Sequence, residues 1–333
     1  MPGFKDIVGH EQIVEHLQNA IRMNKVSHAY LFEGEDGCGK SMTAGIFAAA
    51  LQCEKGGPEP CGVCKSCLQM ASGNQPDVIY VTHEKAGIVV DDIREQVNGD
   101  IHIKPYAGRY KIYIIDEAEK MNEQAQNALL KTIEEPPEYA VLILLCTNRN
   151  KLLPTILSRC VTLSFRAVPG EAIRRYLMEK CKVPDYQASL AAEFAGGNLG
   201  RAVRYASSEE FGSRKDELVH ILKYIEECTM EELMDAVRHL AENKDSIDTE
   251  LDLMMLWYRD VLMFKATKNV NGLLFRDEVG VIRRQAVALS FRHLDAIILA
   301  IQKARMRLKA NVNFDIAMEL MLLTIKENEN EYD

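Results

Sequence analysis

The chain has 333 residues, of which 47% are hydrophobic and 27% charged, a composition typical of a soluble globular protein with two or three domains. The net charge of −9 argues against a protein that coats nucleic acid over its whole surface, although it leaves room for a local basic patch. No apolar run approaches the ~20 residues that cross a bilayer, and the N-terminus lacks a signal peptide's apolar region. We therefore expect a cytoplasmic protein that does not enter a membrane.

The first predicted elements are an entry segment, a helix and a strand. Residues 4–10 precede a helix at residues 12–23, in which Ile13 and Leu17 recur at helical spacing. Residues 29–32 form an apolar run typical of a buried strand, and residues 42–51 predict the helix that follows it.

The segment between that strand and helix fits the pattern of a phosphate-binding loop. Gly34 and Gly39 bracket four residues, and Lys40 and Ser41 follow directly. Gly34, Gly37 and Gly39 let backbone N–H groups of the loop point inward around a phosphate. Lys40 adds positive charge, and Ser41 offers a hydroxyl to Mg²⁺. The pattern predicts a bound nucleoside triphosphate, and the alternative is a glycine-rich turn that binds nothing.

Two carboxylates inside this loop work against a bound anion. Glu35 and Asp36 lie between the glycines, and at close range like charges oppose binding unless the side chains point away. We therefore expect the nucleotide affinity to be weak.

Four cysteines between residues 52 and 68 have the spacing Cys-x7-Cys-x2-Cys-x2-Cys. They are Cys53, Cys61, Cys64 and Cys67. Four thiolates match the ligands of a tetrahedral structural zinc site, which leaves no open position for catalysis. Unligated thiols and an iron–sulfur cluster are the alternatives, although nothing else in the sequence suggests electron transfer. The remaining cysteines are scattered and are expected to pack in the interior.

An acidic pair provides the second half of a hydrolysis site. Asp116 and Glu117 follow an apolar strand predicted at residues 111–115. Asp116 would hold the magnesium ion and Glu117 would orient the attacking water. A surface acidic pair at a strand end is the alternative.

The next two elements lead to a polar segment. A helix is predicted at residues 123–135 and a strand at residues 141–145. The strand ends just before Thr147 and Asn148, where a polar side chain could sense the γ-phosphate.

The order of elements predicts an α/β protein. Strands that alternate with helices from residue 29 to 165 indicate a parallel sheet with helices on both faces and ligands at the carboxyl ends of the strands. From residue 166 onward the pattern is helical. We expect a nucleotide-binding domain at residues 1–165 with a zinc module at 52–68, a small helical domain at 166–208 and an all-helical domain at 209–333. The Met-rich run at 251–257 is expected in a core or subunit interface.

In combination, these motifs resemble the clamp-loader branch of the AAA+ ATPases, and within it the delta-prime subunits of bacterial DNA polymerase III. The likeness covers essentially the whole chain. It rests on residues 27–34, the four-cysteine insert, residues 113–118 and residues 156–160. The resemblance implies a RecA-like ATPase base, a small helical lid, and a helical collar that joins five subunits into an open ring.

The resemblance also implies roles for single residues. Ile7, Val8 and Gly9 would line an adenine pocket, Thr147 would be the first sensor of the γ-phosphate, in preference to its neighbour, and Arg201 would be the second sensor.

Arg159 would be an arginine finger acting in trans on the ATP of a neighbouring subunit. In comparable sites a fixed guanidinium that neutralises charge on the γ-phosphate contributes about 10³–10⁵ in rate. Without the resemblance, a loop salt bridge is the simpler interpretation of Arg159.

Two functions stay open. One is a delta-prime stator, which holds the ring together and donates Arg159. The other is a gamma/tau-type motor subunit that hydrolyses ATP itself, which the intact phosphate loop and acidic pair favour, whereas the atypical Glu35-Asp36 and the single collar favour the stator. A stand-alone helicase lacks a recognisable pore loop. The implied partners are gamma/tau and delta subunits, a sliding clamp and primer–template DNA.

Overall fold

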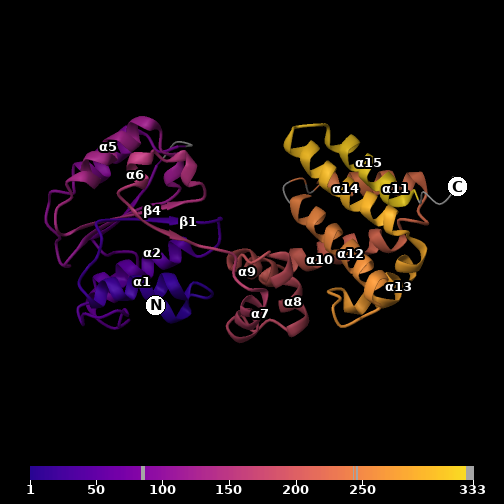
Figure 1. Ribbon diagram of the computed structural model, residues 1–333, viewed down its shortest axis with the longest axis horizontal. Coiled ribbons are helices and arrows are strands. Elements are labelled where there is room, and N and C mark those ends of the chain that lie inside the picture. The colour runs from indigo at the N-terminus through magenta and orange to yellow at the C-terminus, as the bar shows by residue number, and fades with distance from the viewer. Residues whose placement is uncertain (84–86, 243, 245–246, 328–333) are drawn as a thin grey trace. The chain divides into compact units, whose positions relative to one another are not determined.

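The computed structural model describes residues 1–83, 87–242, 244 and 247–327, and it divides into two compact units (Figure 1). Unit 1 comprises Met1–Lys182 and Ala195–Val203, and unit 2 comprises Val183–Phe194 and Arg204–Asp333. Among the described helices, none has both the length and the apolar character needed to span a membrane.

Unit 1 is organised around a five-stranded sheet with the order β2–β3–β4–β1–β5, in which every pairing is parallel. The strands are β1 (Ala29–Glu33), β2 (Val78–Val81), β3 (Lys111–Ile115), β4 (Ala140–Cys146) and β5 (Val161–Ser164). The predicted parallel sheet is therefore confirmed. Because β1 lies between β4 and β5, the loop that follows β1 emerges in the interior of the sheet's carboxyl edge, where open α/β sheets bind ligands.

Helices cover both faces of this sheet (Figure 1). One face carries α1 (Glu11–Arg22) and α2 (Lys40–Leu51), and the other carries α5 (Glu123–Glu134) and α6 (Pro154–Leu157). Side chains alternate along β1 accordingly: Tyr30 packs in the core on the α1–α2 side, whereas Leu31 packs on the α5–α6 side. Both faces of the three central strands, β1, β3 and β4, are buried, which is why these strands appear in the sequence as continuous apolar runs.

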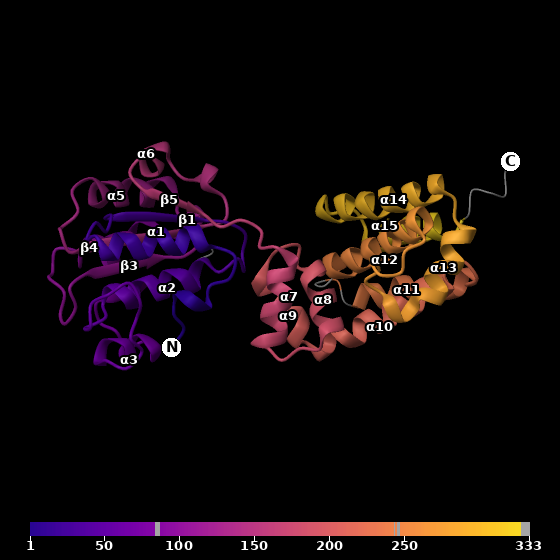
Figure 2. The same ribbon diagram turned by 60° about the horizontal axis from the view of Figure 1, so that its bottom comes forward.

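Residues 90–98, between β2 and β3, form two helical turns of different kinds. An α-helical turn, α4 (Val90–Ile93), continues directly into a π-helical turn, η2 (Arg94–Asn98). The sequence did not indicate α3 (Lys65–Ala71), which lies beside α2 on the side away from the sheet (Figure 2). The short helix η1 (Phe4–Asp6) precedes α1. A 3-10 turn, η3 (Ala118–Lys120), follows β3, and another, η4 (Arg149–Lys151), follows β4. The helix α7 (Gly170–Glu179) follows β5.

The described part of unit 2 is helical, as predicted. Its helices are α8 (Asp185–Phe194), the end of α9 (Leu199–Ser207), α10 (Glu209–Tyr224), α11 (Met230–Glu242), α12 (Ile247–Thr267), α13 (Val279–Ala288), α14 (Phe291–Lys309) and α15 (Phe314–Lys326), with a 3-10 turn, η6 (Arg276–Glu278), before α13. Trp257 on α12 is fully buried, stacks edge-on against Phe275 and donates its indole N–H to Gln285 Oε1 at 2.8 Å. The Met-rich run belongs to this core, as expected, because Leu251 and Met254 are also fully buried.

Candidate nucleotide site and metal centre

The loop between β1 and α2 has the backbone that its glycines predict. Gly37 has φ +82° and Gly39 has φ +97°, both in the left-handed region that costs little only for glycine. Gly39 is the N-cap of α2, so the helix begins at Lys40 and its free N–H groups point into the loop. This geometry is suited to an anion.

Lys40 is turned inward and is only 7% exposed. Its Nζ donates to the carbonyl oxygens of Gly34 and Glu35, both at 2.8 Å. The ammonium group therefore occupies the concave side of the loop, and a phosphate entering there would take the place of these two carbonyl groups as its partner. Ser41 follows on the first turn of α2 and is exposed.

The segment at residues 196–201 closes on the outer side of the same loop. Asn198, which is 3% exposed, donates its side-chain N–H to the Asp36 carbonyl at 2.6 Å, and the Gly200 N–H donates to the Gly37 carbonyl at 3.0 Å. A Cβ at Gly200 would lie 2.6 Å from the Gly37 oxygen, so the approach requires glycine. The tip of the phosphate loop is thus held by a segment more than 150 residues away in the sequence.

The two acidic residues of the loop point outward. Glu35 and Asp36 are exposed, and Glu35 Oε2 lies 3.7 Å from Arg201 Nη2. The structure therefore brings Arg201, the expected second sensor, to the phosphate loop, where it pairs with a carboxylate.

Asp116 and Glu117 follow β3 at the carboxyl edge of the sheet. Glu117 has φ +49° and ψ +42°, a left-handed conformation that is strained for a residue with a Cβ and is frequent at functional sites. Its N–H donates to Asp116 Oδ1 at 2.9 Å, and Lys120 Nζ lies 2.7 Å from Glu117 Oε2. His83, just after β2, lies 3.9 Å from the same oxygen. The pair is accordingly fixed within a small polar cluster.

Thr147, the expected first sensor, follows β4 and is held by Glu119. Glu119 Oε1 accepts from the Thr147 hydroxyl at 2.5 Å and from its N–H at 3.1 Å. The side chain of Asn148 instead caps the 3-10 turn after it by accepting from the Asn150 N–H at 3.0 Å. The sequence did not single out Glu119, which links Thr147 to the segment carrying the acidic pair.

The expected adenine-pocket residues Ile7, Val8 and Gly9 lie between η1 and α1. The next residue, His10, is buried, and its Nε2 lies 3.1 Å from the Cys38 carbonyl of the phosphate loop. Burial lowers the pKa of the His10 imidazole. A hollow of about 530 Å³ opens beside Gly9 and His10 and reaches β5. His10 thus connects residues 7–9 to the phosphate loop, a role that no pattern in the sequence predicted.

Arg159 lies at the amino ends of the strands, opposite the carboxyl ends where the phosphate loop lies. It precedes Val161, which pairs with Tyr30, so Arg159 is level with the residue before β1. The phosphate loop begins after β1, some six residues or roughly 20 Å further along the strand direction. The Arg159 side chain is 41% exposed and lies 3.0 Å from Glu134 Oε1.

The four cysteines of the insert converge. The Sγ atoms of Cys53, Cys61, Cys64 and Cys67 all lie within 4.8 Å of one another, and those of Cys61 and Cys67 are 3.9 Å apart. Ligands at ~2.3 Å from a tetrahedral zinc are about 3.8 Å apart, so the donor set fits a closed Zn–S4 site.

Backbone N–H groups already point at these sulfur atoms. Cys64 N–H donates to Cys61 Sγ at 3.4 Å, and Cys67 N–H donates to Cys64 Sγ at the same distance. Hydrogen bonds from the Val63 and Cys64 amides lower the pKa of Cys61, whereas burial raises the pKa of Cys67. Of the scattered cysteines, Cys38 and Cys146 are buried as expected, whereas Cys181 is exposed, contrary to the prediction.

Comparison with known proteins places these features in a family. A family described as "DNA polymerase III, delta subunit" matches residues 9–169, and "DNA polymerase III, delta subunit, C terminal" matches residues 214–327. The chain is 31% identical to DNA polymerase III subunit delta′ of Bacillus subtilis (strain 168) over 319 residues, which cover 95% of this chain and 96% of the relative. The chain belongs to the delta-prime family of DNA polymerase III subunits.

This member of the delta-prime family also resembles a longer subunit and a solved structure of lower sequence identity. It is 31% identical to DNA polymerase III subunit tau of B. subtilis over 298 residues, which cover 83% of this chain and 53% of tau. Among solved structures, a DNA polymerase III gamma subunit-related protein from Thermotoga maritima is 20% identical, with a TM-score of 0.46 over 94% of this chain and 99% of that chain.

Proposed function

We propose that this chain is the delta-prime subunit of a cytoplasmic clamp loader. In an ATP-dependent cycle it would act with gamma/tau and delta subunits to place a sliding clamp on primer–template DNA. The observation that carries the proposal is the match to a delta-prime relative over nearly the full length of both chains, whereas the match to tau leaves about half of tau uncovered.

Within that complex, Arg159 would act on ATP bound by a neighbouring subunit. Two features support action in trans: the guanidinium is exposed, and it lies at the edge of the sheet opposite its own phosphate loop. Its current partner, Glu134, is 47% exposed, so the pair is screened by solvent and costs little to exchange for a phosphate.

The chain's own nucleotide site would bind ATP with Mg²⁺. Gly34, Gly37, Gly39 and Lys40 would hold the phosphates, and Asp116 with Ser41 would hold the metal. Glu117 would orient water, but hydrolysis there would also need an arginine from another chain.

The four converging cysteines would bind a structural Zn²⁺. Residues 1–165, 166–208 and 209–333 would form base, lid and collar.

A second candidate is a gamma/tau-type motor, because the phosphate loop and the acidic pair are both complete. The two candidates differ in whether the chain's own site turns over ATP. In a reconstituted complex, Lys40→Ala should leave clamp loading largely intact for a stator and abolish it for a motor.

The proposal is tested by reconstitution. The chain is mixed with tau and delta subunits from the same source, a sliding clamp and primed DNA, and loaded clamp is measured with and without ATP. We expect loading to require this chain and ATP together. Full loading in its absence would contradict the proposal.

A further inference from the structure

A long hollow runs between α10 and α11 in unit 2. One part, of about 520 Å³, lies near Tyr224 and Cys228, and a second part, of about 510 Å³, lies near Asp216 and His239. The two parts share lining residues, Ile221 and Ala236 among them, and we name the continuous groove the α10–α11 trough.

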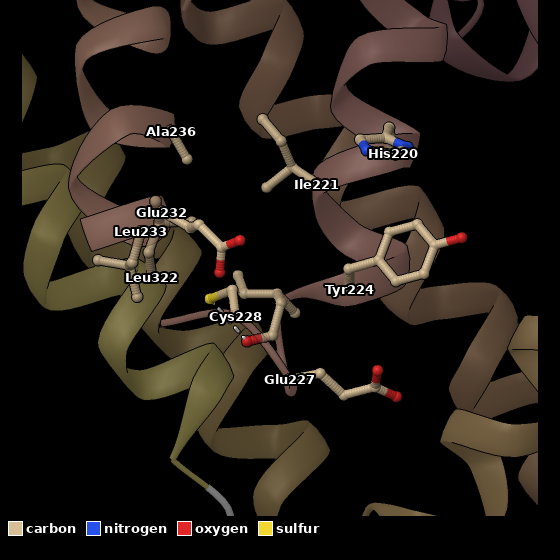
Figure 3. A pocket seen from close by; sticks show the side chains of 10 residues that line it. His220, Ile221, Tyr224, Glu227, Cys228, Glu232, Leu233, Ala236 and Leu322 are labelled. Atoms are coloured by element: carbon tan, nitrogen blue, oxygen red, sulfur yellow. Dashed lines mark hydrogen bonds between the residues drawn. The ribbon is translucent and has the colours of Figure 1, made fainter. Parts of the chain in front are cut away.

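The floor of the trough is apolar. Ile221 from α10, Leu233 and Ala236 from α11, and Leu322 from α15 line it (Figure 3). Ile221 and Ala236 are half-buried, and Leu233 and Leu322 are buried, so the floor belongs to a packed core and is rigid. Tyr224, which is 49% exposed, stands at the rim. Such a floor offers apolar surface to a partner without the ordering cost of a flexible loop.

The walls of the trough are acidic. Asp216, Glu217, Glu227, Glu232 and Asp235 line it, together with His220 and His239, and none of the lining residues that the structure describes is Lys or Arg. Figure 3 shows the Glu232 carboxylate between the two helices, above Cys228. The Thr229 N–H donates to that carboxylate at 2.7 Å, which lowers the pKa of Glu232 and keeps it charged.

Apart from Glu232, the carboxylates of the walls form ion pairs within the chain that are easily exchanged. Asp216 pairs with Lys215 at 3.0 Å, and Asp235 pairs with Arg238 at 2.7 Å, in each case between neighbours on one helix.

Glu227 lies 3.9 Å from Arg284, Glu217 lies 3.0 Å from His239, and Lys326 binds the Cys228 carbonyl below them. Exposed pairs of this kind contribute ~0–1 kcal/mol, so a cationic partner can compete for the same carboxylates.

The dimensions and chemistry of the trough select its occupant. Its α10 wall extends from Asp216 to Tyr224, about 12 Å at the α-helical rise, or roughly two turns, and Glu227 and Cys228 continue it into the turn that follows. Both walls are helices, whose backbone groups are already paired, so an extended peptide would find no strand edge to join. We propose that the α10–α11 trough binds an amphipathic helix of a partner protein, with the helix's apolar stripe on the floor and its Lys and Arg side chains against the acidic walls.

The first test uses a defined probe with the full chain. The probe is a fluorescein-labelled peptide of about four helical turns, with Leu at i, i+3, i+4 and i+7 and Lys or Arg elsewhere. Its matched control replaces every Lys and Arg with Glu. We expect the basic peptide to bind by fluorescence anisotropy at low salt, to weaken as salt is added, and the acidic peptide to bind at least about tenfold more weakly.

Variants then locate the binding. Asp216→Lys with Asp235→Lys reverses both walls, and Ala236→Phe fills the floor; each should weaken the basic peptide about tenfold or more. The matched control, Glu15→Lys with Asp295→Lys, makes the same charge change at exposed positions outside the trough and should leave binding unchanged. Circular dichroism should show all variants folded, and the wall variant alone suffices if Ala236→Phe does not fold.

Three results would overturn the proposal. No binding of the basic peptide up to about 1 mM would show that the trough takes no such helix. If the wall variant and the control variant weakened binding equally, the binding would depend on the net charge of the chain and not on the trough. Sedimentation showing that the chain associates with itself, and that the wall variant abolishes this, would identify a second copy as the occupant. None of these readouts depends on clamp loading.

Discussion

At the scale of single residues, the pair between Glu35 and Arg201 restrains the nucleotide site. The Glu35 carboxylate is 76% exposed and belongs to a loop whose geometry suits an anion. It also forms an ion pair with Arg201, the arginine that is expected to sense a phosphate. Replacing Glu35 with Ala removes a like charge and frees Arg201. Because the pair is exposed, we expect a modest gain, about three- to tenfold tighter binding of a fluorescent ATP analogue with Mg²⁺.

The control for that titration is Glu54→Ala, which removes an exposed carboxylate from outside the loop and should have no effect. Lys40→Ala should abolish binding in either background. Tighter binding by both glutamate variants would attribute the gain to net charge alone and would contradict a specific role for Glu35.

We expect His10 to make the stability of unit 1 depend on pH. Burial lowers its pKa below the ordinary 6.5, so as the pH falls the unfolded chain takes up a proton that the folded chain resists. The contribution of His10 to stability is complete above the unfolded pKa and is lost as the pH falls below it. His10→Gln keeps a donor for the Cys38 carbonyl but does not titrate.

We therefore expect the wild type to lose about 1 kcal/mol more stability than His10→Gln between about pH 7.5 and pH 5.5. Thermal denaturation across this range measures the difference. His102→Gln, which changes an exposed histidine, should follow the wild type. Parallel curves for the wild type and His10→Gln would show that another group controls the pH dependence.

How far the sequence predicted the site depends on how local each interaction is. The phosphate loop and the acidic pair are short patterns whose geometry is set by neighbouring residues, so roles for Lys40 and Glu117 could be proposed from the sequence alone. Asn198 and Glu119 could not, because their partners, Asp36 and Thr147, are separated from them by 162 and 28 residues and meet them only in the folded sheet. No periodicity encodes such contacts.

At the scale of elements, we expect the small cysteine insert to depend on a bound metal ion for its folding. Apart from α3, residues 52–73 consist of turns, so they bury little apolar surface, and four thiolates close together would repel one another without a cation. We expect one zinc per chain. Cys64→Ser should lose it and lower the melting temperature of unit 1 by about 5 °C or more.

Metal analysis of protein purified without chelator tests this prediction, with Cys181→Ser as the matched control because Cys181 is an exposed thiol outside the cluster. Nucleotide binding should change little in Cys64→Ser, since the effect is on folding of the insert. Absence of zinc from the wild type, or its retention by Cys64→Ser, would remove the assignment.

The elements that the sequence missed are short and lie at the periphery. β5 has four residues with mixed exposure at the edge of the sheet, and α3 has seven residues directly after two of the cysteines. Neither has the continuous apolar run that predicted β4 or the long helical spacing of apolar residues that predicted the helices of unit 2. α3 is instead started by Cys64, whose sulfur caps it by accepting from the Cys67 N–H, so the metal-ligand pattern and the helix share residues.

At the scale of the whole molecule, the position of Arg159 supports our proposal that this side chain completes a nucleotide site on a neighbouring chain. Arg159 lies at the amino ends of the strands, whereas its own phosphate loop lies at their carboxyl ends, and we therefore propose that it acts on a γ-phosphate bound by another chain. In a reconstituted complex, Arg159→Ala should slow hydrolysis at the one site that it serves by about 10³-fold or more, because charge on the γ-phosphate would no longer be neutralised. The steady-state ATPase rate should fall to what the other sites supply.

Assembly should not change, because within the described residues the Arg159 side chain makes an exposed ion pair and two local hydrogen bonds, and gel filtration of the complex measures this directly. Arg22→Ala, which removes an exposed arginine from α1, should leave both assembly and ATPase at wild-type levels. An Arg159→Ala complex that assembles and hydrolyses ATP at the full rate would mean that the neighbouring site draws its arginine from elsewhere, and the chain would then be structural alone.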